Sequence, residues 1–187
     1  AKGWLLMIDE VQSGIGRTGK WFGYQHAGIQ PDVITLAKGL GSGVPIGACL
    51  AWVPAAGVFT PGTHGTTFGG GPLVSAAALA TIDIMEEEGL LAHAEQMGQL
   101  IRAILSRELA GIAGVKDIRG RGLMVGVELW KPCGDLVAIA RDKGLIINVT
   151  RDNVVQLLPP LVIKKEEAET LAMELAPLIK AFLEQSA

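Results

Sequence analysis

The sequence predicts an α/β protein with a larger N-terminal domain and a smaller C-terminal one. Two patterns support this prediction: short apolar runs separated by glycine-rich loops in the first part of the chain, and longer segments with helical apolar periodicity. The composition is that of a folded chain, since 49% of the 187 residues are hydrophobic and 19% are charged. Such a composition excludes a disordered tail.

Three short apolar runs predict strands in the first part of the chain. Residues 4–9 are apolar on both faces, as is typical of a buried parallel strand with a neighbour on each side. The runs at 32–37 and 47–53 predict two further strands, and residues 13–31 form a glycine-rich loop before the second of them. The first run begins abruptly, without an initiator Met, so we expect a fragment or a chain whose first half lies elsewhere.

A helix is predicted after the glycine- and threonine-rich loop at 60–71. Pro72 suits its first turn, and Gly89 suits its end. One face of this helix carries apolar side chains, namely Leu73, Ala76, Ala77, Ala80 and Ile84. A second helix is expected over residues 90–109.

The pattern changes near residue 110. Strand-like segments alternate there with a short helix at 135–143, and these segments lie at 122–129, 145–149 and 154–158. A helix at 166–184 closes the chain. We therefore predict that residues 1–109 are part of a large α/β domain and that residues 110–187 form a small α+β domain.

Charge and cysteine content argue against several classes of partner. The sequence has 16 Lys and Arg against 19 Asp and Glu, a net charge of −3, and its pI is about 5.6. With no basic run, this argues against nucleic acid or an anionic membrane as the main partner. No apolar stretch approaches the roughly 18 residues of a membrane span. Cys49 and Cys133 lack the spacing of a zinc site or a disulfide framework, so we expect a cytoplasmic protein without a metal.

One glycine pattern requires a test as a dinucleotide site. Gly14-Ile15-Gly16-Arg17-Thr18-Gly19 fits G-x-G-x-x-G and follows a predicted strand. The residues after it lack a helical period, although such a site needs a helix there. We therefore interpret this segment as a loop without that function.

The ends of two predicted strands carry the groups with the clearest chemistry. Asp9 ends the first strand, and Lys38 ends the second and precedes a glycine-rich turn. Ligands of open α/β sheets bind beyond the carboxyl ends of parallel strands. Lys38 is either a solvated lysine at the sheet edge or a Schiff-base lysine that forms an imine with a carbonyl cofactor such as pyridoxal phosphate. In the second case, Asp9 is the acid beside the pyridine nitrogen.

Four motifs occur in order around these two residues. They are Ile8-Asp9-Glu10-Val11-Gln12, Gly14-x-Gly-Arg17-Thr18-Gly19, Pro31-Asp32 through Leu36-Ala37-Lys38-Gly39-Leu40, and Gly65-Thr66-Thr67-Phe68-Gly69-Gly70. Together they resemble the class III (subgroup II) pyridoxal-phosphate-dependent aminotransferases, and residues 24–28 are most similar to the acetylornithine/ornithine branch. The resemblance covers essentially the whole chain, but only the C-terminal half of such an enzyme.

The resemblance implies pyridoxal 5'-phosphate as the cofactor and assigns roles to five residues. Lys38 would form the imine and later move a proton between cofactor and substrate carbons, while Asp9 would pair with the pyridinium nitrogen. Val11 would pack on the ring, and Gln12 would reach the phenolic oxygen. Thr67 would bind the cofactor phosphate of the neighbouring subunit, so the resemblance implies a homodimer.

The implied fold is part of the large domain of the PLP-dependent transferase fold type I, followed by its small C-terminal domain. The implied reaction moves the terminal amino group of an amino acid to a 2-oxo acid, 2-oxoglutarate. Two alternatives are a 4-aminobutyrate or other ω-amino acid aminotransferase, and a catalytically incompetent fragment or assembly subunit. The missing N-terminal half, in the same or a separate polypeptide, is an expected partner.

Two positions depart from the family pattern. Gln156 stands where the family usually has an arginine that binds the substrate carboxylate through a charge-assisted pair. Gly71 stands where an asparagine commonly precedes the proline. Because glutamine carries no charge, either carboxylate substrates bind less tightly or another cation replaces the arginine.

Overall fold

The computed structural model describes residues 2–184, which form two compact units that divide between Leu91 and Ala92. The sequence instead predicts a domain boundary after residue 109. The units divide earlier because helix α2 (Leu90–Glu108) buries Ile101 and Leu105 completely in the core of the second unit. The helix therefore belongs with the C-terminal unit by its packing.

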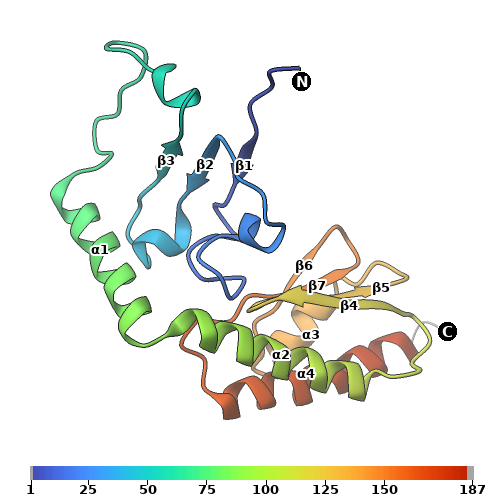
Figure 1. Ribbon diagram of the computed structural model, residues 1–187. Coiled ribbons are helices and arrows are strands. Elements are labelled where there is room, and N and C mark those ends of the chain that lie inside the picture. Colours follow the sequence, from blue (N-terminus) through green and yellow to red (C-terminus); the bar gives the residue numbers. More distant parts are fainter. Residues whose placement is uncertain (1, 185–187) are drawn as a thin grey trace. The chain divides into compact units, whose positions relative to one another are not determined.

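The first unit contains a three-stranded sheet with the strand order β1-β2-β3 (Figure 1). β1 (Met7–Asp9) runs parallel to β2 (Val33–Leu36), and β3 (Ala48–Ala51) runs antiparallel to β2. The register places Asp9 opposite Thr35. The three predicted strands are all present, and each is shorter than its apolar run because the ladder of paired residues ends first.

One long helix and three short 3-10 turns complete the first unit. α1 (Pro72–Glu87) begins at a proline, whose fixed φ suits the first helical position. The 3-10 turns are η1 (Gly23–His26), η2 (Lys38–Gly41) and η3 (Ala55–Gly57). α1 packs against η2, the turn that directly follows the second strand.

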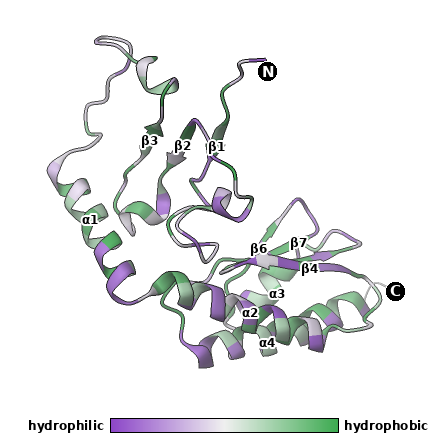
Figure 2. Ribbon diagram, viewed as in Figure 1, coloured by the Kyte–Doolittle hydropathy of each residue, from purple (hydrophilic) through white to green (hydrophobic). Residues whose placement is uncertain are grey.

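The segment that leads into β1 is apolar but exposed. Trp4 is 83% exposed and Met7 is 65% exposed, and Leu5 and Leu6 are also exposed. In Figure 2 this segment is coloured mainly as hydrophobic. β1 is an edge strand with a hydrogen-bonded neighbour on one side only. The predicted parallel pairing is therefore correct. Within residues 2–184, however, β1 has a neighbour on one side only and its apolar side chains are exposed, so the predicted burial between two neighbours is not seen there.

The second unit is built on a four-stranded antiparallel sheet with the order β4-β5-β7-β6. Its strands are β4 (Val115–Arg121), β5 (Met124–Leu129), β6 (Asn148–Thr150) and β7 (Val154–Leu157). Burial alternates along β5, where Val125, Val127 and Leu129 point to the core, and β7 adds Val155 and Leu157 to the same core.

Three helices bury their apolar faces in the core of this unit: α2, α3 (Leu136–Asp142) and α4 (Lys165–Glu184). Hydrophobic and hydrophilic residues alternate along α2 and α4 in Figure 2, as expected for helices with one buried face. Cys133 lies in the same core, and burial raises the pKa of its thiol. Of the helices in residues 2–184, none combines the length and hydrophobicity that a bilayer span needs.

Strand β4 is the element that the sequence pattern does not predict. Its outward positions are charged and its inward positions include Gly120, so the segment lacks an apolar run. Two of its three cations pair instead with Glu128 on β5: the Nζ of Lys116 and the Nη1 of Arg119 each donate to this carboxylate at 2.6 Å. Arg119 also donates to Asp117 at 3.0 Å. The bonds from Lys116 and Arg119 hold the pKa of Glu128 below its usual range.

We expect the stability of the protein to depend on pH through Glu128. Its pKa is lower in the folded protein than in the unfolded chain, so the ion pairs stabilise the fold above the usual pKa of a carboxyl. This contribution is lost as the pH falls through the folded-state pKa. Glu128→Gln should therefore lower the free energy of unfolding at neutral pH, and urea unfolding in acid should show no difference from wild type. A difference that persists in acid contradicts this expectation.

Candidate active site

The structure places Asp9 and Lys38 at the same edge of the first sheet. Asp9 is the last residue of β1, and Lys38 lies two positions beyond the end of β2, which is parallel to β1. The carboxyl ends of parallel strands lie at one edge of a sheet, and this edge is where ligands of open α/β folds bind. The sequence-based expectation that these two residues share an edge therefore agrees with the strand topology.

The carboxylate of Asp9 is held on one side only. Its Oδ1 accepts a hydrogen bond from the backbone N–H of Val11 at 2.9 Å and a longer one from the hydroxyl of Thr35 at 3.4 Å. Within residues 2–184, its Oδ2 accepts no hydrogen bond, and the side chain is exposed. One oxygen thus fixes the orientation of the carboxylate, and the other is available to a ligand.

Lys38 has an unusual backbone conformation. It begins η2 with φ at +43°, in the left-handed region that non-glycine residues rarely adopt. Such a conformation costs about 1–3 kcal/mol and persists where the surrounding structure enforces it, often at functional sites. The turn that follows is tight, because a Cβ at Gly41 would lie 2.7 Å from the Cγ2 of Ile46. The side chain of Lys38 itself is exposed.

The other three predicted residues divide into two groups. Val11 and Gln12 lie in the turn directly after β1, where Val11 is half-buried and Gln12 is exposed. They therefore share the sheet edge of Asp9. Thr67 lies in the separate loop before α1 and is exposed. Its role toward a neighbouring subunit stays a prediction.

The glycine-rich loop after β1 does not open a helix of the kind that binds dinucleotides. Residues 11–20 form turns, and the 3-10 turn η1 follows them. The Nε2 of His26 lies 3.0 Å from the carbonyl oxygen of Thr18 and 3.2 Å from its hydroxyl, which closes the loop on itself. This arrangement agrees with the interpretation of the segment as a loop.

Sequence reasoning missed two residues that shape this site, Thr35 and Glu10. Thr35 reaches Asp9 only because the strand register places them opposite each other, and no motif indicates that. Glu10 is completely buried beside Asp9, with its carboxylate hydrogen-bonded to the following loop. The sequence does show an acidic residue, Glu10, directly after an apolar strand. That pattern is equally typical of an exposed carboxylate, so it does not predict burial.

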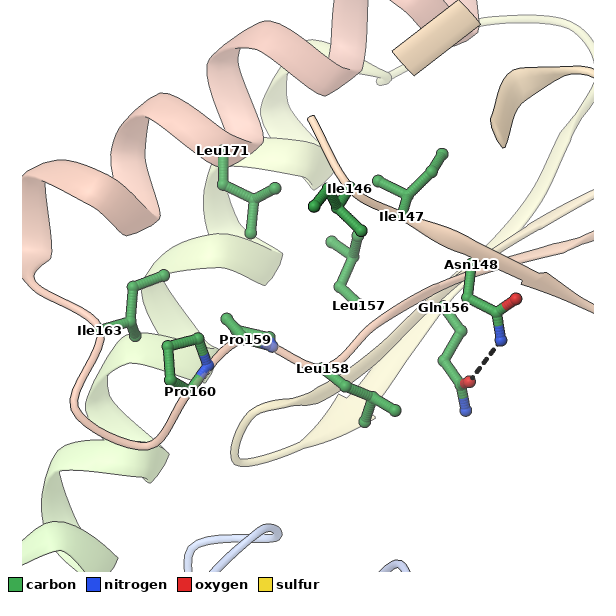
Figure 3. Close-up of a pocket in the computed structure, with 10 residues that line it drawn as sticks. All are labelled: Ile146, Ile147, Asn148, Gln156, Leu157, Leu158, Pro159, Pro160, Ile163 and Leu171. Atoms are coloured by element: carbon green, nitrogen blue, oxygen red, sulfur yellow. Dashed lines mark hydrogen bonds between the residues drawn. The ribbon is translucent and has the colours of Figure 1, made fainter. Parts of the chain in front are cut away.

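Gln156 lies in the second unit, on the central strand β7. The Nδ2 of Asn148 on β6 donates to its Oε1 at 3.3 Å, as Figure 3 shows. Both amides line a cavity of about 430 Å³ whose other lining side chains, including Ile163 and Leu171, are apolar. The amide pair supplies hydrogen-bond donors and acceptors but no positive charge.

The fold is an α/β arrangement with an exposed lysine amine and an exposed carboxylate at the carboxyl ends of two parallel strands, groups that suit a carbonyl cofactor. A family model described as Aminotransferase class-III matches residues 1–179. The chain therefore belongs to the class III aminotransferase family.

Curated relatives and solved structures agree with this assignment. Acetylornithine aminotransferase 1 of Bordetella bronchiseptica is 64% identical over 184 residues, covering 98% of this chain and 47% of that protein. The acetylornithine aminotransferase of Nitrosomonas europaea is 54% identical, covering 97% of this chain and 46% of its own length. The chain thus spans about half the length of the curated relatives it matches.

Among solved structures, the ornithine aminotransferase of Toxoplasma gondii matches with a TM-score of 0.90 and 37% identity, covering 97% of this chain and 44% of that chain. The acetylornithine aminotransferase of Elizabethkingia anophelis matches with a TM-score of 0.86 and 35% identity, covering 95% and 46%. These matches identify the fold as that of the PLP-dependent aminotransferases, as the sequence predicts.

The family implies pyridoxal 5'-phosphate as the cofactor, and a further structure of the Toxoplasma gondii enzyme has this compound at its active site. The residues at the sheet edge fit such a group. Lys38 offers an exposed primary amine, and the Oδ2 of Asp9 is an unengaged carboxylate oxygen at the same edge. A carbonyl and a protonated ring nitrogen are the groups these two side chains match.

Proposed function

We propose that this chain supplies the C-terminal half of a pyridoxal-phosphate-dependent aminotransferase of the acetylornithine/ornithine type. The reaction moves the terminal amino group of an amino acid to 2-oxoglutarate. The observation that carries the proposal is the placement of Asp9 at the carboxyl end of β1 and of Lys38 just beyond the carboxyl end of the parallel strand β2. The 64% identity to an acetylornithine aminotransferase supports this branch of the family.

The proposal assigns each residue at the sheet edge a task. When bound, the cofactor supplies a carbonyl that condenses with amines and a ring that withdraws electrons. The Nζ of Lys38 would hold the cofactor through its carbonyl and, when released from it, would carry a proton to and from the substrate. The Oδ2 of Asp9 would hold a proton on the ring nitrogen, Val11 would pack on the ring face, and Gln12 would hydrogen-bond the phenolic oxygen.

The proposal also includes two partners. The first partner is the rest of an aminotransferase chain, in the same or a separate polypeptide. It covers the side of β1 that faces away from β2, which an additional strand or an apolar surface would bury. A second subunit forms a homodimer and places its cofactor phosphate against Thr67. A cytoplasmic location, expected from the composition, stays a prediction.

Borohydride reduction in the presence of pyridoxal phosphate, followed by intact mass under denaturing conditions, tests the proposal. The sample is the assembled protein, which means this chain together with the polypeptide that supplies the rest of a relative's length. We expect one cofactor mass fixed on the peptide that contains Lys38. The isolated 187-residue chain should bind the cofactor weakly, because it spans only about half the length of its relatives. An assembled protein that gains no mass contradicts the proposal.

A catalytically incompetent subunit is a second candidate, and Gln156 is the observation that favours it. If the position binds a substrate carboxylate, Gln156→Arg supplies the missing charge, and a hydrogen bond to a charged group is worth about 2 kcal/mol. We then expect kcat/KM for 2-oxoglutarate in the assembled protein to rise by about thirtyfold or more. Asn148→Ala, which breaks the amide pair without adding a charge, is the matched control. No gain with arginine favours the incompetent subunit.

A further inference from the structure

Glu10 is the charged side chain that the proposed reaction leaves without a role. It is only 1% exposed, whereas the Asp9 and Gln12 side chains in the same motif are exposed. A carboxylate is costly to bury unless hydrogen bonds satisfy it, so its position needs an explanation.

Every polar group of Glu10 is engaged. Its carboxylate accepts hydrogen bonds from the hydroxyl of Ser13 at 2.6 Å and from the backbone N–H groups of Gly23 and Tyr24 at 2.9 Å and 2.8 Å. Its own N–H donates to the carbonyl oxygen of Thr35 at 2.9 Å. Its carbonyl oxygen accepts from the N–H of Gly14 at 2.9 Å. The residue therefore ties the end of β1 to both β2 and the following loop.

The loop packs closely around these bonds at two glycines. A Cβ at Gly14 would lie 2.7 Å from the carbonyl oxygen of Glu10, well inside contact distance. A Cβ at Gly23 would lie 3.2 Å from the Oε2 of Glu10 and 3.1 Å from the Cβ of Ser13. Glycine at these two positions is thus what allows the loop to approach the carboxylate.

The bonds of Glu10 also restrict the two residues beside it, Asp9 and Val11. These two are joined across Glu10, because the backbone N–H of Val11 donates to the Oδ1 of Asp9. With the backbone of Glu10 fixed at both its N–H and its carbonyl, the peptide units from Asp9 to Gln12 have little freedom to turn. The direction of the free Oδ2 of Asp9 depends on that restriction.

We propose that Glu10 is a positioning residue of the cofactor site, whose buried carboxylate holds Asp9 and Gln12 in the arrangement that binds the cofactor ring. This inference rests on the proposed function. It assigns Glu10 no contact with the cofactor: the carboxylate anchors the loop through Ser13, Gly23 and Tyr24, and the anchored loop supports the backbone bonds of Glu10 that fix the end of β1.

Glu10→Gln in the assembled protein is the sharpest test. The change keeps the size of the side chain but replaces one acceptor oxygen by an NH2 group, which would face a backbone N–H that also donates. We expect the dissociation constant for pyridoxal phosphate, measured by equilibrium dialysis, to rise by about tenfold or more. The pH at which the absorption of the bound cofactor changes should shift as well. Ser13→Ala removes one of the three donors and should give a smaller change in the same direction.

Met85→Ala is the matched control for a loss of stability alone. Met85 is 3% exposed in α1 of the same unit, and it has no part in the site. We expect Met85→Ala to lower the melting temperature without changing the dissociation constant or the absorption profile. The proposal is overturned if Glu10→Gln binds the cofactor like wild type. It is also overturned if Met85→Ala, with the same loss of melting temperature as Glu10→Gln, weakens cofactor binding to the same extent.

Failure of Glu10→Gln to fold and failure of the wild-type protein to bind the cofactor lead to different conclusions. If Glu10→Gln does not fold, Ser13→Ala and Gly23→Ala decide the matter: raised dissociation constants in folded protein support the proposal, and unchanged ones overturn it. If the wild-type assembled protein itself takes up no cofactor, the proposed function fails. Hydrogen exchange of the Gly23 and Tyr24 amides, faster in Glu10→Gln than in Met85→Ala, then still reports on the anchoring of the loop by Glu10.

Discussion

Lys38→Ala is expected to abolish both cofactor attachment and transamination in the assembled protein. In the proposed reaction the primary amine of Lys38 binds the carbonyl of the cofactor and carries the proton, and alanine has no amine to do either. Removing a group of this kind lowers turnover by about a thousandfold or more. The measurements are the intact mass after borohydride reduction, which should show no added cofactor, and the rate of transamination.

Lys20→Ala is the control for this experiment. Lys20 lies in the same unit, and its Nζ donates to the backbone carbonyl of Gln25 at 3.3 Å, so its loss disturbs only a surface loop. This variant should retain the added mass and a turnover close to wild type. If Lys38→Ala left transamination intact, the assignment of the reaction to this lysine, and of the chain to this chemistry, would be wrong.

Asp9→Asn is expected to leave cofactor attachment in place while it slows turnover by about a hundredfold or more. An asparagine oxygen can still accept the hydrogen bonds from Val11 and Thr35, so the side chain keeps its place. Its amide group then occupies the position of the free oxygen. Because an NH2 group donates and cannot hold a proton on the ring nitrogen, the ring loses much of its capacity to withdraw electrons.

Asp32→Asn provides the same chemical change outside the sheet edge that we propose as the cofactor site. Asp32 directly precedes β2, and its Oδ2 accepts a hydrogen bond from the N–H of Leu6 at 2.7 Å. This variant should lower stability slightly and leave turnover near wild type. Equal losses of turnover in the two variants would show that Asp9 acts through stability rather than through the ring.

Cofactor attachment and turnover together separate the roles of the three acidic and basic groups near the sheet edge. Loss of attachment identifies Lys38, loss of turnover with attachment retained identifies Asp9, and weakened binding with an altered absorption profile identifies Glu10. These expectations follow from where each group lies: the first two are exposed at the carboxyl ends of β1 and β2, and the third is buried behind them.

Much of the fold follows from local sequence patterns. Apolar runs that end in Asp9 and Lys38 predict the strands of the first sheet, and the proline at residue 72 marks the start of α1, because both signals depend on neighbouring residues alone. The family likewise follows from four ordered motifs. Strand β4 escapes such reasoning because its charged residues are stabilised by Glu128, a partner on another strand.

The sequence by itself determined the family, the α/β class and the two residues at the strand ends, because these depend on residue type and short spacing. Only the tertiary structure decided that Thr35 reaches Asp9, that Glu10 is buried, and that α2 packs with the second unit. These features depend on strand register and on contacts between segments far apart in the chain. The exposure of Trp4 has the same origin, since an apolar strand is buried only where other parts of the protein cover it.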